Sequence, residues 1–169
     1  MLYKYYNLAE SINAGVILDQ IDRKIIAELQ KNGRLNNQEL SEKVALSPSP
    51  CLRRVRQLEN KKIIHGYTAI VDQDACGLPI TAFVSVRLEK QNQESIEILE
   101  RGIVDLDEVI ACYLMSGTSD YLLHVLSASL KDYESFIRDK LTRIPGMGTV
   151  ETHFAFGQVK RTQVFPGFT

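Results

Sequence analysis

Apolar residues recur at helical spacing in two stretches near the start of the chain, and a residue that can cap a helix precedes each stretch. The first stretch begins near Leu18-Asp19 and ends at Asn32-Gly33, so we expect a helix that Asp19 caps. A shorter helix is expected after Asn36, because Asn36 and Glu39 have the spacing of a capping box. The apolar stripes of these two helices are Leu18, Ile21, Ile25, Ile26 and Leu29, and then Leu40 and Val44.

A third helix is expected to begin in the run Ser47-Pro48-Ser49-Pro50 and to end in Lys61-Lys62. Ser47 can occupy the N-cap, and Pro48 fits the first helical position, where a backbone N–H has no intrahelical partner. Three short helices with a tight break between the second and the third are typical of a helix-turn-helix unit. The core-facing positions of the third helix, spaced i, i+4 and i+7, are Cys51, Val55 and Leu58.

The pattern becomes strand-like over residues 63–71, and the turn-rich connector 72–79 then indicates a domain boundary. Beyond it, strand and helix periodicities alternate. Their order predicts an α+β fold, the ferredoxin-like βαββαβ arrangement, with a four-stranded antiparallel sheet and both helices on one face. The expected strands are 81–88, 109–115, 121–126 and 150–156, and the expected helices are 94–104 and 130–144.

The expected strands carry apolar residues on both faces of the sheet. Because the helices cover only one face, the other needs a partner, and we expect a homodimer, since most soluble oligomers have two-fold symmetry. The apolar residues in question are Ala82, Val84, Val86 and Leu88 on one face of the first strand, Phe83 on its other face, and Phe154 and Phe156 opposed to Ala155 in the last strand.

Length and composition exclude several classes of protein. A chain of 169 residues, 44% hydrophobic and 24% charged, is expected to fold into one domain or two small ones. No stretch approaches the roughly 18 apolar residues of a membrane span, so we expect no membrane partner and a cytoplasmic location. The three cysteines are widely spaced and the three histidines form no cluster, so we expect neither a metal site nor a cofactor.

Charge is distributed unevenly along the chain. Through Asp72 there are 11 lysine and arginine residues against 8 aspartate and glutamate residues, a net of +3, and from Gln73 onward there are 9 against 13, a net of −4. The positive excess is concentrated between Pro48 and Lys62, which favours a polyanion-binding module joined to an acidic domain. A solvated helix face is the alternative interpretation.

The side of the third helix opposite its core face has side chains that suit the DNA major groove. Arg53 can bind guanine O6 and N7 bidentately, Gln57 can bind adenine, and Lys61 and Lys62 suit phosphates. On a dimer, two such helices would read two half-sites. A small helical bundle with a merely solvated basic face is the alternative. The predicted DNA-binding residues are Ser47, Ser49, Arg53, Arg54, Arg56, Gln57, Lys61 and Lys62.

Five strings carry a family resemblance: Leu18-Asp19-x-Ile21-Asp22-Arg23-Lys24-Ile25, Leu46-Ser47-Pro48-Ser49-Pro50-Cys51-x-x-Arg54-Val55-x-x-Leu58-Glu59, Ile64-x-Gly66-Tyr67-Thr68-Ala69, Met115-Ser116-Gly117-x-x-Asp120-Tyr121-Leu122 and Ile144-Pro145-Gly146. Through them the chain resembles, over residues 18–164, the Lrp/AsnC family of leucine-responsive or feast/famine transcriptional regulators. The resemblance implies a helix-turn-helix domain, a C-terminal domain for regulation of amino-acid metabolism (RAM), and dimers that assemble into tetramers or octamers. It also implies a free amino-acid effector bound in clefts between neighbouring C-terminal domains.

The resemblance places the effector at a glycine-containing turn and on the last strand. Backbone N–H groups of the turn can hold the effector carboxylate, and Asp120 can pair with its ammonium, although Asp120 could instead bond its own loop. Where leucine-responsive members have two acidic residues, this chain has Gly157-Gln158, and where they have an aromatic hydroxyl on the last strand, it has His153. The alternative for His153 is a packed residue that contacts no effector. An effector-independent regulator is therefore an alternative. The implied effector-binding residues are Leu114, Gly117, Thr118, Ser119, Asp120, His153, Phe154 and Ala155.

The sequence thus predicts a non-enzymatic, sequence-specific DNA-binding regulator. An enzyme is disfavoured because no nucleophile–base pair, metal cluster or phosphate loop is visible. A ligand-binding, oligomerising module whose helical half docks a protein is the other alternative. The predicted divisions are an N-terminal extension 1–17, a helix-turn-helix domain 18–62, a strand and linker 63–79, a ligand-binding and oligomerisation domain 80–160 and a C-terminal tail 161–169.

Overall fold

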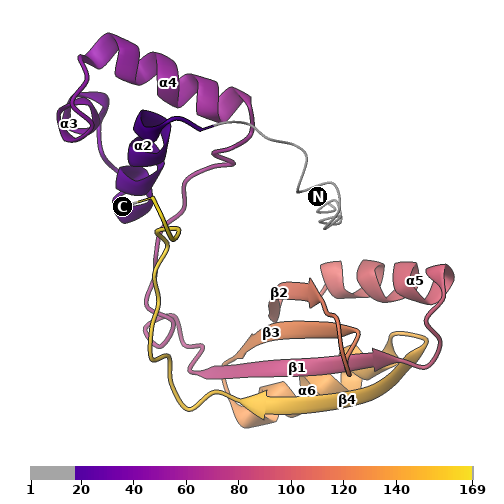
Figure 1. Ribbon diagram of the computed structural model, residues 1–169. Coiled ribbons are helices and arrows are strands. Elements are labelled where there is room, and N and C mark those ends of the chain that lie inside the picture. The colour runs from indigo at the N-terminus through magenta and orange to yellow at the C-terminus, as the bar shows by residue number, and fades with distance from the viewer. Residues whose placement is uncertain (1–17, 169) are drawn as a thin grey trace. The chain divides into compact units, whose positions relative to one another are not determined.

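The computed structural model describes residues 18–168 and divides the chain into two compact units (Figure 1). The first unit comprises the described residues up to Ile70 together with residues 160–168, and the second comprises residues 71–159. The predicted N-terminal extension lies outside the described residues. No helix in the described part of the chain has the length and apolar character needed to cross a membrane.

Three helices build the first unit, as the sequence predicts: α2 (Gln20–Lys31), α3 (Asn37–Lys43) and α4 (Pro48–Asn60). The side chain of Asp19 accepts the backbone N–H of Asp22 at 2.8 Å and so caps α2. The capping box of α3 is confirmed, because Glu39 N–H donates to Asn36 Oδ1 and Asn36 N–H donates to Glu39 Oε2, each at 2.9 Å.

The apolar faces of the three helices meet in one core. Cys51 is fully buried and Leu58 is 3% exposed, which confirms the predicted inward face of α4. Burial also raises the pKa of the Cys51 thiol, so this cysteine acts as a small apolar packing group. The core comprises Ile25, Ile26, Leu40, Val44, Cys51 and Leu58, with Leu18, Ile21, Leu29, Leu35, Leu46, Val55, Ile63, Ile64 and Phe168 packed against it.

The prediction of a strand over residues 63–71 is wrong, since this segment joins no sheet in the described chain. A strand is stable only when a neighbour pairs with its backbone, and its apolar residues Tyr67, Ile70 and Val71 stay exposed. The segment instead returns to α4, where the Tyr67 O–H donates to Glu59 Oε1 at 3.0 Å. Partial desolvation of the Tyr67 hydroxyl, followed by this bond to the Glu59 carboxylate, raises the pKa of Tyr67 to about 12.

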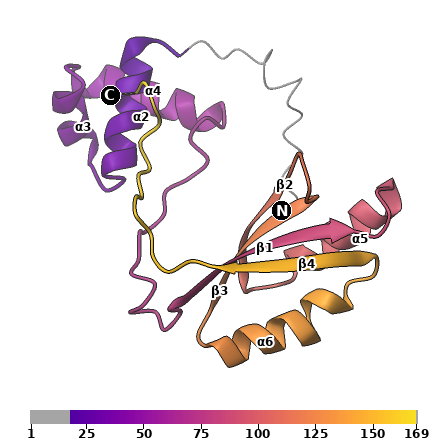
Figure 2. The same cartoon turned by 60° about the horizontal axis from the view of Figure 1, so that its bottom comes forward.

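The second unit has the ferredoxin-like element order that the sequence predicts. Its elements are β1 (Ile80–Leu88), α5 (Gln93–Val104), β2 (Val109–Leu114), β3 (Tyr121–Ser127), α6 (Leu130–Asp139), the short 3-10 helix η1 (Leu141–Arg143) and β4 (Met147–Phe154). All the strand pairs are antiparallel, and the strand order across the sheet is β2-β3-β1-β4. The strands β2 and β4 therefore form opposite edges of the sheet (Figure 2).

Two elements differ from the predicted ranges by more than one residue at an end. The helix predicted over 130–144 ends at Asp139, because Lys140 leaves the helical region with a φ of −121° before η1 begins. The last strand begins at Met147 and ends at Phe154, earlier at both ends than predicted, because its pairing with β1 runs from Met147 opposite Leu88 to Phe154 opposite Ala82. A Cβ added to Gly148 would lie 2.9 Å from the carbonyl oxygen of Arg87, so only glycine permits this close approach.

The two helices of this unit cover one face of the sheet. Val84 of β1 has no exposed surface and packs in a core with Leu99 of α5 and Phe136 of α6. On the opposite face the ring of Phe83 remains 36% exposed and stacks on the ring of His124 with centroids 4.8 Å apart. We call this uncovered surface the open sheet face, and its residues are Phe83, Tyr113, Leu122, His124 and His153.

Candidate functional site

The outer side of α4 and its flanks gather the predicted DNA-binding residues. Because Cys51 and Leu58 fix the buried side of the helix, residues at the intervening positions of the 3.6-residue period face outward. Lys62 has a φ of 56°, which ends the helix and leaves its side chain exposed with that of Lys61. The exposed members of the predicted set are Ser47, Ser49, Arg53, Arg56, Gln57, Lys61 and Lys62.

The start of α4 offers few backbone donors. Ser47 occupies the N-cap position as predicted, but its side chain makes no capping hydrogen bond. Pro48 and Pro50 lack a backbone N–H, so Ser49 supplies the free N–H of this turn. The side chain of Asn37 holds α3 against this turn, because its Nδ2 donates to the carbonyl oxygen of Pro48 at 2.9 Å. Side-chain hydroxyls of Ser47 and Ser49 are therefore the main polar groups that this end of α4 presents.

Arg54, a member of the predicted DNA-binding set, binds two carboxylates within the first unit. Its Nη1 lies 2.7 Å from Asp19 Oδ2 and 2.8 Å from Asp22 Oδ1, both at the start of α2. The backbone N–H of Asp22, followed by the Arg54 guanidinium, lowers the pKa of Asp19, and the two carboxylates raise the pKa of Arg54. These contacts of Arg54 hold α4 against α2, and its contact with DNA stays a prediction.

The predicted effector turn lies between β2 and β3 and is tied to the end of β1. Gly117 has a φ of 126°, which a side chain disfavours, and the turn is closed by Met115 N–H donating to the Asp120 carbonyl oxygen at 2.8 Å. The Asp120 carboxylate accepts the backbone N–H of Leu88 at 2.8 Å and the side-chain amide of Gln91 at 2.7 Å. Each carboxylate oxygen of Asp120 thus accepts one bond that positions this turn, and the pairing of Asp120 with an effector ammonium stays a prediction.

The two halves of the implied effector site lie far apart in the sheet of one chain. Leu114, at the end of edge strand β2, pairs with Tyr121, whereas His153 of the opposite edge strand β4 pairs with Phe83. The strands β3 and β1 separate them (Figure 2). One chain therefore brings Leu114, Gly117, Thr118, Ser119 and Asp120 together, but not with His153, Phe154 and Ala155.

The three residues on and after β4 have distinct surroundings. His153 is exposed, and its Nε2 lies 3.5 Å from Glu151 Oε1. The ring of Phe154 packs edge-on against the ring of Tyr133 with centroids 5.0 Å apart, and Ala155 N–H donates to the Thr81 carbonyl oxygen at 3.0 Å. Of these residues, the side chain of His153 is the one best placed to meet a ligand on the open sheet face.

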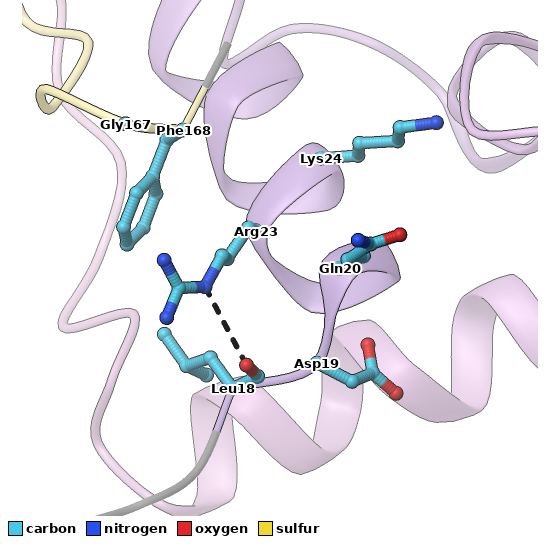
Figure 3. Close-up of a pocket in the computed structure, with 7 residues that line it drawn as sticks. All are labelled: Leu18, Asp19, Gln20, Arg23, Lys24, Gly167 and Phe168. Atoms are coloured by element: carbon cyan, nitrogen blue, oxygen red, sulfur yellow. Dashed lines mark hydrogen bonds between the residues drawn. The ribbon is translucent and has the colours of Figure 1, made fainter.

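A pocket in the first unit lies outside every predicted site (Figure 3). It has a volume of about 630 Å³, and the ring of Phe168 and the guanidinium of Arg23 lie side by side in it. The sequence interpretation treated residues 161–169 as a tail, although Pro166-Gly167 is a turn signal that could have shown a folded end. The pocket is lined by Leu18, Asp19, Gln20, Arg23, Lys24, Gly167 and Phe168.

Each of the two units matches the model of a known protein family. A winged helix-turn-helix DNA-binding model matches residues 18–65, and a model of the Lrp/AsnC ligand binding domain matches residues 81–165. The chain belongs to the Lrp/AsnC family. This confirms the resemblance inferred from the sequence motifs. As an Lrp/AsnC protein it is a DNA-binding transcriptional regulator with a ligand-binding domain, in a family that is not enzymatic.

Named relatives of this Lrp/AsnC protein match nearly along their full length. The Bkd operon transcriptional regulator of Pseudomonas aeruginosa is 42% identical over 142 residues, which cover 84% of this chain and 93% of that protein. The leucine-responsive regulatory protein of Escherichia coli is 38% identical over 148 residues, which cover 88% of this chain and 90% of that protein. The structure of a transcriptional regulator from Neisseria meningitidis, in complex with L-Met, has a TM-score of 0.84 and 36% identity, and the match covers 88% of this chain and 96% of that chain.

Proposed function

We propose that this Lrp/AsnC protein recognises its operators by placing the exposed side of α4 in the DNA major groove. The observation that carries the proposal is the position of Arg53 and Gln57. Both are exposed on the side opposite the buried Cys51, and neither side chain has a hydrogen-bond partner within the described chain. Their guanidinium and amide groups are therefore free to bond base edges.

The remaining exposed residues suit contacts with the phosphate backbone. Lys61 and Lys62 lie at one end of α4 and the hydroxyls of Ser47 and Ser49 at the other. Such contacts set the register and orientation of a helix on the duplex without reading sequence. Arg56 belongs to the same exposed side and adds positive charge between these two ends.

Selection of bound sequences from a random DNA pool tests this placement. Arg53→Ala or Gln57→Ala is expected to weaken binding to the best operator by about 1–3 kcal/mol and to relax the motif at one position. Lys61→Ala should instead weaken all sequences alike and reduce the salt dependence, because a phosphate contact is lost.

Arg101→Ala, which removes an exposed arginine of α5, is the matched control and should leave affinity unchanged. An unchanged motif and affinity in Arg53→Ala would contradict the placement of α4. A wild type that selects no motif would favour the alternative in which the helical unit docks a protein.

We further propose a free amino acid as the effector, bound between the β2–β3 turn of one chain and the His153–Ala155 segment of another. The L-Met bound by the Neisseria relative supports this class of ligand. Backbone N–H groups of the turn would hold the carboxylate, and the carboxylate of Asp120 would keep the turn in shape. Calorimetry with L-methionine and the other protein amino acids tests the proposal. No binding by any of them would favour an effector-independent regulator.

The proposed assembly is a homodimer through the open sheet face, with further assembly to a tetramer or octamer, acting in the cytoplasm. An exposed ring stack such as Phe83–His124 is the kind of apolar surface that a second copy would cover. On such a dimer two α4 helices would read two half-sites of one operator.

A further inference from the structure

Residues Phe165-Pro166-Gly167-Phe168 form a turn, which we call the C-terminal turn. Phe168 N–H donates to the Phe165 carbonyl oxygen at 3.3 Å, and Gly167 has a φ of 78°. Proline at the second position and glycine with positive φ at the third are the signature of a type II turn. The sequence therefore encodes this shape locally, and the ring of Phe168 packs against the helical core.

The C-terminal turn contacts α2 at two places separated by two helical turns. Phe168 is half-buried against the core, and the Arg23 guanidinium lies 5.5 Å from the centroid of its ring (Figure 3). Two helical turns further along α2, Phe165 N–H donates to Gln30 Oε1 at 3.2 Å. The rings of Phe165 and Phe168 pack edge-to-face with centroids 5.8 Å apart, which joins the two contacts into one unit.

The start of α2, which the C-terminal turn contacts through Arg23, also holds α4. Arg23 lies in the same helical turn as Asp22, and Asp22 with Asp19 binds Arg54 of α4. Arg54 is adjacent in sequence to Arg53, the proposed base-reading residue. The start of α2 therefore contacts both the C-terminal turn, through Arg23, and α4, through Asp19 and Asp22.

We propose that the C-terminal turn is a positioning element of the DNA-reading unit, with Phe168 and Arg23 fixing α2 and thereby the orientation of α4. The inference rests on the proposed DNA recognition by α4. The C-terminal turn follows β4 in the chain, so the reading unit is joined to the ligand-binding domain by two chain segments, 71–79 and 155–163, rather than one.

The experiment compares full-length Phe168→Ala with Phe168→Tyr, which retains the ring, and with Phe156→Ala, which removes an equally large but fully exposed ring. Amide hydrogen exchange is measured in α2 and α4, and operator affinity is measured on the same samples. Loss of the cation–π contact is expected to speed exchange in both helices and to weaken DNA binding about two- to fivefold in Phe168→Ala. Phe168→Tyr and Phe156→Ala should match the wild type.

Exchange in α2 and α4 that is unchanged in Phe168→Ala would overturn the proposal, as would faster exchange in α2 with no change in α4 or in DNA affinity. Arg23→Gln provides a second variant, which removes the charge but keeps a long polar side chain, and it should reproduce the effect on exchange. A wild type that binds no DNA would contradict the proposed function alone, because the exchange measurement needs no DNA.

Discussion

The carboxylate of Asp120 joins two segments that are distant in sequence. It accepts hydrogen bonds from Leu88 N–H and from the side chain of Gln91, while its own N–H donates to the Val86 carbonyl oxygen at 2.9 Å. Removing the Asp120 carboxylate leaves the partly buried Leu88 N–H without its acceptor. This loss is more damaging than the loss of the bond from the exposed Gln91 amide, because a buried donor without an acceptor costs its full desolvation energy. Asp120 is thus a structural residue of the turn.

Asp120→Ala is expected to lower the free energy of unfolding by about 1–3 kcal/mol, because a charge-assisted bond to a backbone N–H is lost. Gln91→Ala removes only the bond to an exposed amide and should cost clearly less. Urea denaturation of both variants, followed by circular dichroism, makes the comparison. Equal stability of Asp120→Ala and the wild type would contradict the structural role.

At the scale of single residues, the sequence predicts which side of a helix is buried but not which partner a charged side chain binds. The helical period correctly separates buried Cys51 from outward Arg53, because one helix determines both. It does not reveal that Arg54 binds Asp19 and Asp22, which are 35 and 32 residues away and belong to another helix. The role of a charged residue depends on which partner the tertiary fold supplies, and the local pattern contains no such information.

At the scale of elements, the capped starts of helices were predicted correctly, whereas the strand predicted over 63–71 was not. The caps of α2 and α3 lie within four residues of the backbone groups they satisfy, so the sequence contains the complete signal. The segment 63–71 has the composition of a strand, but pairing requires a partner that composition cannot supply. The shifted start of β4 has the same cause, since pairing with β1 extends that strand to Met147.

Gly148 allows a prediction at this scale. A Cβ there would meet the backbone at the end of β1, with Arg87 O at 2.9 Å, and Glu89 N just beyond the strand at 3.1 Å, and neither strand can move away without disturbing the sheet. Gly148→Ala is expected to lower the free energy of unfolding by about 1–3 kcal/mol through overpacking. Gly157→Ala, where no atom lies within 4 Å of the added carbon, is the matched control and should not destabilise. Thermal unfolding of the two variants distinguishes them, and equal midpoints would contradict this account.

At the scale of the whole molecule, the open sheet face determines the expected assembly. Phe83→Asp places a charge in the middle of this face and is expected to raise the dimer dissociation constant about tenfold or more. Val104→Asp changes an exposed apolar residue of α5 and serves as the control. Sedimentation velocity over a dilution series measures both, and an unaltered dimer in Phe83→Asp would place the interface elsewhere.

The order of elements was sufficient to predict the ferredoxin-like unit and the helix-turn-helix unit, because each is formed by consecutive segments. The docking of the C-terminal turn on α2 was missed, since the bond between Phe165 and Gln30 spans 135 residues. Contacts at that separation follow from the complete fold, and the Pro166-Gly167 turn signal alone does not identify the surface it meets.

The edge positions of β2 and β4 have a consequence for how the affinity for the effector changes when the protein is diluted. If Leu114 and His153 contact the same ligand, the two contacts come from different polypeptides, and ligand capture and association of chains become thermodynamically linked. The apparent affinity for L-methionine should then fall when the protein is diluted below its association midpoint, and saturating L-methionine should move that midpoint to lower concentration. Titrations at two protein concentrations on either side of the midpoint measure this, and identical affinities would mean that each chain binds the ligand alone.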